Sequence, residues 1–394
     1  MEYGRVLSAV EALSGRGMDF GLSRTRALLD GLGSPDGKLK IIHISGSNGK
    51  GSVAEFVTQI LLAAGKTAGT FTSPAVFDYL EQFKINGENI SREAYAEAFG
   101  EAVKLGSSAT RFEVETAGAL NAFALAGCEY AVVECGLGGT YDATNAILRK
   151  VAALIASISL EHTAVLGNTL ESICSHKAGI IKDCSAVVSA FNPPEVLNYF
   201  KKLGAKVADG VEITGERSFS YGGKDYRLAM DGCAQPYNAA VAIECAKGLE
   251  IAESAIYTGV NRAKLPARLQ KISAGGNIYV LDGAHNPAAF VPLAGYLKKL
   301  GGADCAVFGS LSDKDVRGNL LSLKGLVKRV IAVTPDSPRA MAAEEVLRIC
   351  DGCGIPAEKA DGVGKALEKA GGTVVICGSF TLLKEAEKWI GKRL

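Results

Sequence analysis

The sequence has almost no net charge and no long hydrophobic run. Its 43 lysines and arginines nearly balance 42 aspartates and glutamates, which leaves a formal charge of +1. This balance gives no electrostatic reason to expect binding to nucleic acid or to an anionic membrane. The longest strongly apolar run, residues 151–160, is about half of what a membrane-spanning helix needs. Charged residues also interrupt the N-terminus, where a secretion signal needs a continuous apolar stretch. We therefore expect a cytoplasmic protein that binds neither nucleic acid nor membrane.

Other familiar patterns are missing as well. The ten cysteines are scattered, and most lie in apolar segments, so free buried thiols in a reducing compartment are expected rather than a disulfide framework. Cys350 and Cys353 form one CxxC at a predicted helix end, but no second pair completes a zinc site, which disfavours a metal or redox role. No GxGxxG follows a predicted strand, so a dinucleotide-binding fold is disfavoured. The chain has no internal repeat.

The 394 residues exceed what one hydrophobic core usually serves, and two domains are expected. Apolar strands alternate with helices, which predicts an α/β fold with largely parallel sheets. We expect a P-loop ATPase domain over residues 1–262, a linker at 263–270, and a smaller Rossmann-like α/β domain over 271–394. Short polar strands around residues 211–230 predict a small antiparallel element in the first domain. The expected strands are 40–45, 130–135, 151–159, 186–190, 278–281, 305–308, 330–333 and 373–377, and the more clearly bounded helices are 2–13, 23–32, 53–65 and 235–249.

A glycine-rich loop, residues 46–52, stands between the first expected strand and a helix. Backbone N–H groups at a helix N-terminus bind anions, and glycines let the backbone approach a phosphate closely. Lys50 would neutralise the β- and γ-phosphates, and Ser52 would reach a magnesium ion. The spacing departs from GxxxxGK[ST] because Gly51 separates the lysine from the serine. A purely structural turn is the alternative, but the strand before and the helix after favour ATP binding.

Polar residues follow two further expected strands. Glu134 ends the strand YAVVE, and Glu161-His162 follows the apolar run that begins at Val151. Side chains at the carboxyl ends of parallel strands face the crevice where ligands of open α/β sheets bind. One or two carboxylates suffice to hold magnesium beside substrate phosphates. A solvent-facing acid and a structural histidine are the alternatives.

Two more positions stand out for opposite reasons. Lys177 lies in a helical stretch, where a lysine is ordinarily a solvated surface residue. Asp282, His285 and Asn286 follow the strand IYVL directly before Pro287. This cluster suits ligand contact, and Asn286 also suits the N-cap of a helix that begins at the proline.

Many short motifs occur in one order along nearly the whole chain. They are HISGSNGKGSV at 43–53, FTSP at 71–74, INGENI at 85–90, Phe112-Glu113, VECGLGGTYDATN at 133–145, LEHTAVLGNTLESICSHKAGIIK at 160–182, LPARLQ at 265–270, LDGAHNP at 281–287, VFGSLSDKD at 307–315 and CGSF at 377–380. Together they resemble the folylpolyglutamate synthase/dihydrofolate synthase family of the Mur ligase superfamily. The phosphate loop shares the family's glycine between lysine and serine.

The resemblance implies an ATP-dependent amide ligase, acting as a monomer, that adds L-glutamate to a folate or pteroate carboxylate through an acyl phosphate. It implies nucleotide contacts by Asn48, Gly49, Lys50, Gly51, Ser52, Asn238, Arg268 and Asp282. Two Mg²⁺ ions would be held by Ser52, Ser73, Glu134 and His162. The catalytic groups would be Lys50, His162, Lys177, Arg268 and His285. The pterin-bearing substrate would lie at Phe112, Glu113, Tyr141, Asp142 and Ala143. Lys177 matches a lysine that is carboxylated in the family, in place of the surface role expected from its helix alone.

Departures from the family pattern lie mainly on the acceptor side. The family's arginine after the paired glycines is replaced in the stretch Thr140-Tyr141, and its histidine after Ser-Pro is Ala75. Glu161 replaces an aspartate and Ala267 a glycine. These differences leave open whether the acceptor is dihydropteroate, a folate, both, or another carboxylate joined to another amino acid. A non-catalytic nucleotide-binding homologue is the third alternative, against which the joint retention of Lys50, Glu134, His162 and Lys177 speaks.

Overall fold

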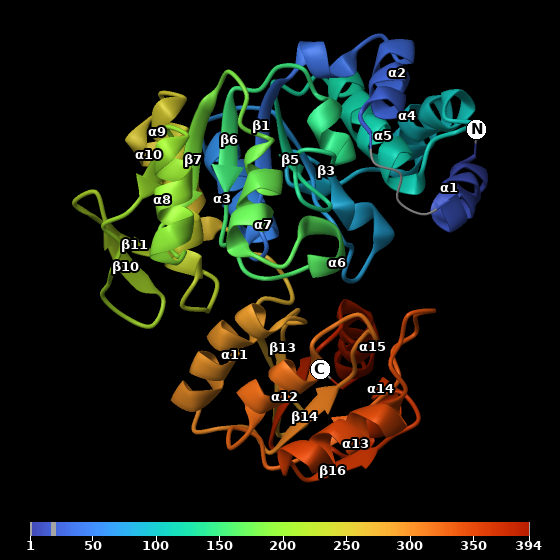
Figure 1. Ribbon diagram of the computed structural model, residues 1–394, viewed down its shortest axis with the longest axis vertical. Helices are drawn as coiled ribbons and strands as arrows, with labels where there is room; N and C mark the ends of the chain where they lie inside the picture. Colours follow the sequence, from blue (N-terminus) through green and yellow to red (C-terminus); the bar gives the residue numbers. More distant parts are fainter. Residues whose placement is uncertain (1, 17–20, 394) are drawn as a thin grey trace. The chain divides into compact units, whose positions relative to one another are not determined.

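The computed structural model describes residues 2–16 and 21–393, which form two compact α/β units. One unit comprises Met1–Ala229 and Gln235–Ala263, and the other comprises Met230–Ala234 and Lys264–Leu394. Each has its own sheet (Figure 1). The fold class predicted from the sequence is confirmed, with a mostly parallel sheet in the first unit and a separate, smaller mixed sheet in the second.

The first unit contains an eight-stranded sheet in the order β4-β3-β2-β5-β1-β6-β7-β8. Pairing is parallel from β2 to β8 and antiparallel in β2–β3 and β3–β4. The central strands KIIHIS and YAVVE are buried along almost their whole length, as expected for strands covered on both faces. The bounds are β1 Lys40–Ser45, β2 Ala68–Phe71, β3 Phe83–Ile85, β4 Glu88–Asn89, β5 Tyr130–Glu134, β6 Ala152–Ile155, β7 Ser185–Ser189 and β8 Lys206–Ala208.

Helices cover both faces of this sheet. One core joins α1, α2, α4 and α5 to the sheet, and another lies under α7 and α8. Helix α3 packs against the strands and against α9 and α10. The bounds are α1 Tyr3–Ala12, α2 Ser23–Gly31, α3 Lys50–Ala63, α4 Arg92–Leu105, α5 Arg111–Leu125, α6 Thr163–Leu166, α7 Leu170–Ala178, α8 Pro194–Lys202, α9 Gln235–Gly248 and α10 Glu253–Arg262.

The small antiparallel element is also present. It consists of β9 Glu212–Ile213, β10 Ser218–Tyr221 and β11 Lys224–Arg227. Gly222 and Gly223 connect β10 to β11, and both have positive φ (58° and 76°), the backbone conformation that a two-residue hairpin turn of this kind requires.

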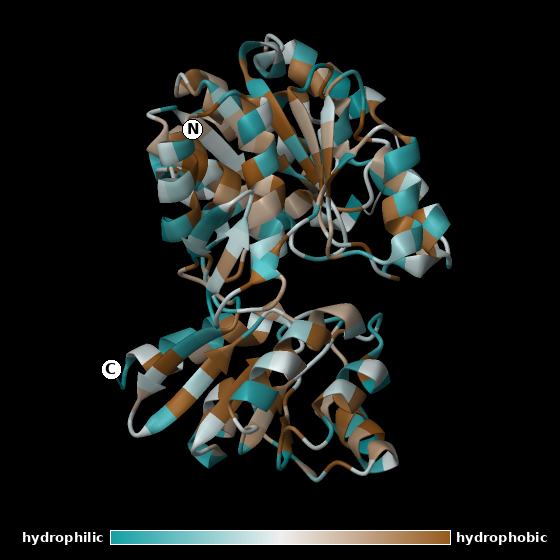
Figure 2. Cartoon of the chain, turned by 90° about the vertical axis from the view of Figure 1, so that its left-hand side faces the viewer, coloured by the Kyte–Doolittle hydropathy of each residue, from teal (hydrophilic) through white to brown (hydrophobic). Residues whose placement is uncertain are grey.

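The second unit has a six-stranded sheet in the order β12-β13-β17-β14-β15-β16, parallel except for β12. Hydrophobic residues recur along the strands of both units (Figure 2). The bounds are β12 Gln270–Ala274, β13 Asn277–Leu281, β14 Cys305–Phe308, β15 Val330–Ala332, β16 Ala357–Lys359, β17 Thr373–Cys377, α11 Pro287–Lys299, α12 Val316–Leu323, α13 Ala343–Cys353, α14 Val363–Lys369 and α15 Phe380–Gly391. Among the described residues, no helix is both long and apolar enough to span a bilayer.

Three sequence expectations differ from these elements. Strand β6 ends at Ile155 rather than at residue 159, so Glu161 and His162 lie in a loop instead of at a strand end. Helix α3 begins at Lys50 rather than Val53, directly inside the glycine loop. The short strands β2, β3, β4, β8, β12 and β16 were not foreseen, because two to five residues carry too little periodicity to be recognised.

The cysteines are free thiols and most are buried, as predicted.

Gly259 packs α10 directly against the backbone of α3. A Cβ added there would lie 2.4 Å from the Cα of Ile60 and 2.5 Å from its backbone nitrogen, and backbone atoms cannot rotate away. We expect Gly259→Ala to lower the free energy of unfolding by about 1–3 kcal/mol through overpacking. The control is Gly248→Ala at the exposed end of α9, where nothing lies within 4 Å. It should be neutral or stabilising in the same urea titration, and equal losses in both variants would contradict the packing argument.

Candidate active site

The parallel register brings four loops to one edge of the first sheet. Ile44 pairs with Glu134, Ser45 with Ile155, and Phe71 with Val133, so β1, β2, β5 and β6 end almost level. The glycine loop, the segment that contains Ser73, the loop after Glu134 and the segment leading to His162 therefore all start at this edge. This is where open α/β sheets bind ligands.

The glycine loop is held tightly against its neighbours. Gly46 and Gly49 have φ of 147° and 90°, a region that side chains disfavour. A Cβ at Gly49 would lie 2.7 Å from Asn238 Oδ1, so this α9 side chain packs directly on the loop. Asn48 donates its side-chain amide to Ser159 Oγ at 3.3 Å. Because α3 starts at Lys50, the first-turn amides of Lys50 to Ser52 have no acceptor within the helix, and this geometry suits an anion.

Lys50 and Glu134 face each other across this edge. Lys50 Nζ lies 3.8 Å from Glu134 Oε1 and donates to the carbonyl of Ser47 at 3.4 Å. The Glu134 side chain is only 5% exposed. Both distances are long, so the ammonium is held without a tight contact and can turn to a phosphate. A buried carboxylate beside it suits a divalent cation.

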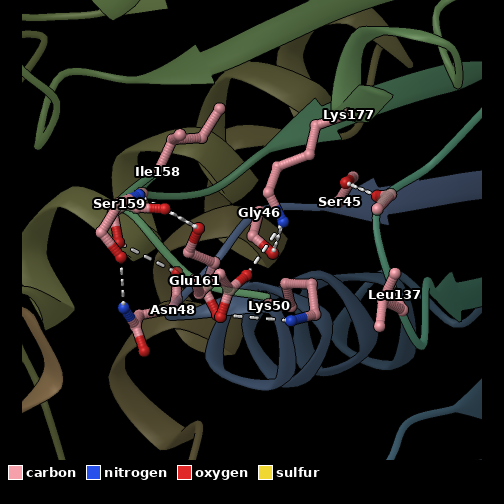
Figure 3. A network of polar contacts seen from close by, with 12 residues as sticks. Ser45, Gly46, Asn48, Lys50, Leu137, Ile158, Ser159, Glu161 and Lys177 are labelled. Atoms are coloured by element: carbon pink, nitrogen blue, oxygen red, sulfur yellow. Dashed lines mark hydrogen bonds and ion pairs between the residues drawn. The ribbon is translucent and has the colours of Figure 1, made fainter. Parts of the chain in front are cut away.

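Lys177 is buried, not solvated, so the surface role expected from its helical setting is wrong. Its side chain is 1% exposed, and Nζ donates to the carbonyl of Gly46 at 2.8 Å and to Glu161 Oε1 at 3.0 Å (Figure 3). Burial, together with nearby Lys50, lowers the pKa of Lys177 although Glu161 opposes this. Burial alone would raise the pKa of Glu161, but the charges of Lys177, Lys50 and His162 lower it to about 2.

His162 occupies a constrained place beside this pair. Its φ is 48°, in the left-handed region that non-glycine residues rarely adopt, and it directly precedes α6. A residue kept in this conformation is over-determined by its surroundings, which is common at functional sites.

The expected acceptor-binding residues gather at the start of α5 and in the loop after β5. The Phe112 ring packs 5.7 Å from that of Phe71, and a Cβ on Gly136 would lie 2.6 Å from it. Glu113 accepts from the Thr110 amide at 2.7 Å and pairs with Arg24 at 3.0 Å. Its carboxylate therefore has structural partners.

The second part of this group lies on the loop itself. Asp142 is buried and accepts from the amides of Leu137 (2.8 Å) and Thr144 (3.0 Å); burial raises its pKa against these hydrogen bonds. Tyr141 is 54% exposed, and its ring lies 6.2 Å from that of His176. Ala143 is buried at the start of a short 3-10 turn. Of these three, Tyr141 presents the most surface to a ligand.

The second unit brings Arg268, Asp282 and His285 together. Asp282 is buried and accepts from the amides of Leu269 and Ala284, each at 2.9 Å. Burial raises its pKa, and Arg268 opposes the shift. The Arg268 guanidinium lies 5.3 Å from the Phe380 ring centroid, and the His285 ring lies 5.6 Å from the same ring.

Two details define this cluster further. His285 Nδ1 donates to the carbonyl of Gly283 at 2.8 Å, which leaves Nε2 as the acceptor atom of a neutral ring. Asn286 caps α11 by accepting from Ala289 at 2.8 Å, so the predicted N-cap is confirmed.

Sequence reasoning missed a buried polar group beneath the loop after β5. His43, in the middle of β1, places Nε2 2.7 Å from Thr144 Oγ1 and 3.1 Å from Cys135 Sγ. Thr144 donates its hydroxyl proton to Asp142, so it accepts from His43, and the proton belongs on Nε2. His43 Nδ1 has no hydrogen-bond partner within the described part of the chain. The available signal was a histidine inside an otherwise apolar strand.

Burial, with smaller effects from Lys150 and Lys182, holds the pKa of His43 well below its ordinary value near 6.5. Below pH 6.5 the unfolded chain therefore binds a proton at this histidine and the folded chain does not. The free energy of unfolding falls as the pH drops. We expect this residue to contribute a slope of up to about 1.4 kcal/mol per pH unit. His43→Gln should remove that slope between pH 6.5 and 5 in urea unfolding. Parallel pH profiles for the variant and the parent protein would contradict a neutral buried His43.

Comparison with known proteins agrees with this geometry. The Mur ligase middle domain family matches residues 44–245, and the Mur ligase glutamate ligase domain family matches residues 267–380. The dihydrofolate synthase/folylpolyglutamate synthase of Bacillus subtilis is 31% identical over 94% of this chain and 95% of its own.

Solved structures extend the likeness to three dimensions. Escherichia coli FolC in complex with DHPP and ADP superposes with a TM-score of 0.89 at 31% identity, over 100% of this chain and 98% of that one. A bifunctional folylpolyglutamate synthase/dihydrofolate synthase of Yersinia pestis, complexed with AMPPNP and a manganese ion, gives a TM-score of 0.86 at 29% identity over 98% of both chains. The chain is an ATP-dependent ligase and belongs to the dihydrofolate synthase/folylpolyglutamate synthase family of Mur ligases.

Proposed function

We propose that this protein adds L-glutamate to the carboxylate of a pteroate or folate, through an acyl phosphate made from ATP. The observation that carries the proposal is the convergence of Lys50, Glu134 and the buried pair Lys177–Glu161 on the glycine loop. Residues 1–262 would act as the ATP-binding domain, 263–270 as a linker and 271–394 as the glutamate-ligase domain. Relatives such as the dihydrofolate synthase/folylpolyglutamate synthase of Bacillus subtilis support the assignment.

The ATP phosphates would bind the glycine loop from Asn48 to Ser52, beside Asn238. The first-turn amides of α3 and the loosely held Lys50 ammonium supply positive charge at the point where phosphoryl transfer needs it. In the second unit, we assign nucleotide and glutamate contacts to the cluster of Arg268, Asp282 and His285.

The donor set also fits divalent cations. Glu134 is a buried carboxylate 3.8 Å from the Lys50 ammonium, and Ser52 and Ser73 supply hydroxyls from loops that begin at the same edge. His162 would serve a second ion. Bound Mg²⁺ would neutralise charge on the phosphates and act as a Lewis acid. The manganese ion in the Yersinia pestis relative supports the use of a divalent metal.

Carboxylation of Lys177 is part of the proposal. The neutral amine nitrogen would attack the carbon of CO₂ and lose a proton, giving a carbamate anion. Burial lowers the pKa of Lys177 and so raises the fraction of neutral amine available to react, and its position beside Gly46 and Glu161 places the group next to the glycine loop. As an anion it could support the second metal ion.

In the reaction, an oxygen of the acceptor carboxylate attacks the γ-phosphorus and ADP leaves. The amine of glutamate then attacks the acyl carbon, an amide bond forms, phosphate leaves and the amine loses a proton. Lys50 and the loop amides stabilise the transferring phosphoryl group, while the acceptor is held near Phe112 and the loop from Tyr141 to Ala143.

A second candidate acceptor is a different carboxylic acid. The carboxylates of Glu113 and Asp142 already accept hydrogen bonds from the protein, and Thr140 stands in the stretch where the family has an arginine. Fewer charged groups are then available to bind a pteroate or folate acceptor.

The deciding experiment incubates the protein with MgATP and glutamate, adding dihydropteroate, tetrahydrofolate or no acceptor. ADP formation and product mass are measured, and the absence of any amide product with both acceptors would overturn the folate assignment.

Lys50→Met should lower kcat by at least about 100-fold, because it removes the positive charge that stabilises the transferring phosphoryl group in the transition state. Lys66→Met is the matched control: Lys66 is partly exposed and pairs with Glu129 away from the loop. The control should keep the parent kcat and KM for ATP in a coupled ADP assay. A Lys50→Met enzyme with parent kcat would refute the assigned role.

Removing divalent metal tests the metal assignment separately. Chelation by EDTA should abolish ADP and amide formation together, and added Mg²⁺ should restore both. Glu134→Gln should raise the Mg²⁺ concentration needed for half-maximal rate by about 10–100-fold, because a carboxylate ligand is lost. An unchanged Mg²⁺ requirement in this variant would exclude Glu134 as a ligand.

A further inference from the structure

Asn145 is a buried asparagine that joins three segments of the first unit. Its side chain is almost inaccessible, and Nδ2 donates to the carbonyls of Thr140 at 3.0 Å and Gly179 at 3.1 Å. Its Oδ1 accepts from Lys150 Nζ at 2.6 Å. Gly179 directly follows α7, so one side chain ties the loop after β5 to the end of the helix that carries Lys177.

Lys150 determines which way the Asn145 amide points. Lys150 as a whole is 9% exposed, and its ammonium donates to two uncharged oxygens, Asn145 Oδ1 and the Ile180 carbonyl, the latter at 3.1 Å. An ammonium can only donate, so it must face Oδ1, and a flipped amide would set NH₂ against NH₃⁺. Both amide protons are therefore directed at Thr140 and Gly179.

A second set of contacts acts on the same turn. The backbone amide and the hydroxyl of Thr140 both donate to the carbonyl of His176, at 2.7 and 3.0 Å. A Cβ on Gly179 would lie 2.0 Å from Thr140 Oγ1, so the loop and the turn are in direct contact. The main chain is thus held at His176 and at Gly179, on either side of Lys177.

We propose that Asn145, oriented by Lys150, is a positioning residue that holds the last turn of α7 so that the Lys177 amine reaches Gly46 and Glu161. The long side chain of Lys177 ends at two buried acceptors, the Gly46 carbonyl and Glu161 Oε1. Its contacts with them, 2.8 and 3.0 Å, leave little tolerance for movement of the α7 main chain. Displacements of about 1 Å in a supporting group are enough to impair a site. The inference rests on the proposed function, in which Lys177 takes part in catalysis.

Asn145→Asp is the decisive variant. The carboxylate retains an acceptor for Lys150 and adds a charge partner, which favours folding, but it replaces the two amide donors with an oxygen that repels the carbonyls of Thr140 and Gly179. We expect kcat to fall about 10–100-fold, as for other supporting groups, with KM for MgATP within about twofold of the parent value. Labelling with ¹³C-bicarbonate should show a weaker carbamate signal on Lys177 by NMR, and excess bicarbonate should restore part of kcat.

Asn121→Asp is the matched control. Asn121 is also a buried asparagine, and its Nδ2 donates to the carbonyl of Ala98 at 3.1 Å, between α5 and α4. The change has the same chemistry and lies away from α7. It should keep the parent kcat and carbamate signal, even if its melting temperature falls.

The outcomes separate the two levels of the argument. Parent-like kcat and carbamate in Asn145→Asp would overturn the positioning role, as would an equal loss of kcat in both aspartate variants with no effect of bicarbonate. A parent enzyme that forms no amide contradicts the proposed function instead, and the carbamate signal then still tests Asn145. A parent enzyme that is active but free of carbamate contradicts carboxylation alone, and the kcat and KM values of the two variants then decide.

Discussion

The parallel pairing of β1 with β5 on one side and β6 on the other is the constraint on which the site depends. Hydrogen bonding fixes the register, and the register sets where each strand stops. Four loops from distant parts of the sequence then begin at one edge. The glycine loop with its Lys50, the Glu134 carboxylate and Lys177 meet there although they come from three distant parts of the sequence. A shift of one residue in either pairing would turn Glu134 or its neighbours to the other face of the sheet.

Burial then determines the chemistry of the groups gathered at this edge. Lys177 and Glu161 are a cation and an anion that water scarcely reaches, so each strongly influences the protonation of the other. Lys150 is also buried, with amide oxygens as its acceptors, and burial lowers its pKa to about 8. The two lysines show two uses of a buried amine: Lys177 lies beside the proposed reaction site, and Lys150 orients the Asn145 amide.

The sequence predicted best those features that depend on residues close to one another along the chain. The strand KIIHIS, the following glycines and the N-cap at Asn286 could all be predicted, because each depends on residues within a few positions. Lys177 could not be understood from its own helix, since its burial results from Gly46 and Glu161, which are 131 and 16 residues away along the chain. The resemblance to a family drew attention to this lysine, whereas helical periodicity alone gave the wrong environment.

The same reason explains what was missed. His43 interrupts an apolar strand, but its partners Thr144 and Cys135 come from another part of the chain. Asn145 belongs to a recognised motif, yet its orientation depends on Lys150 and its effect on Gly179. The end of β6 at Ile155 also escaped prediction, because the apolar residues continue beyond the point where the ladder stops.

The second unit is discontinuous in sequence, since Met230–Ala234 belongs to it while Gln235–Ala263 returns to the first. The backbone amide of Leu265 approaches the sulfur of Met230 at 3.2 Å within that unit. A single cut near residue 263 would therefore remove Met230–Ala234 from the unit to which this segment belongs. Exchange of this module between relatives, by engineering or by recombination, should respect three crossover points in the chain instead of one.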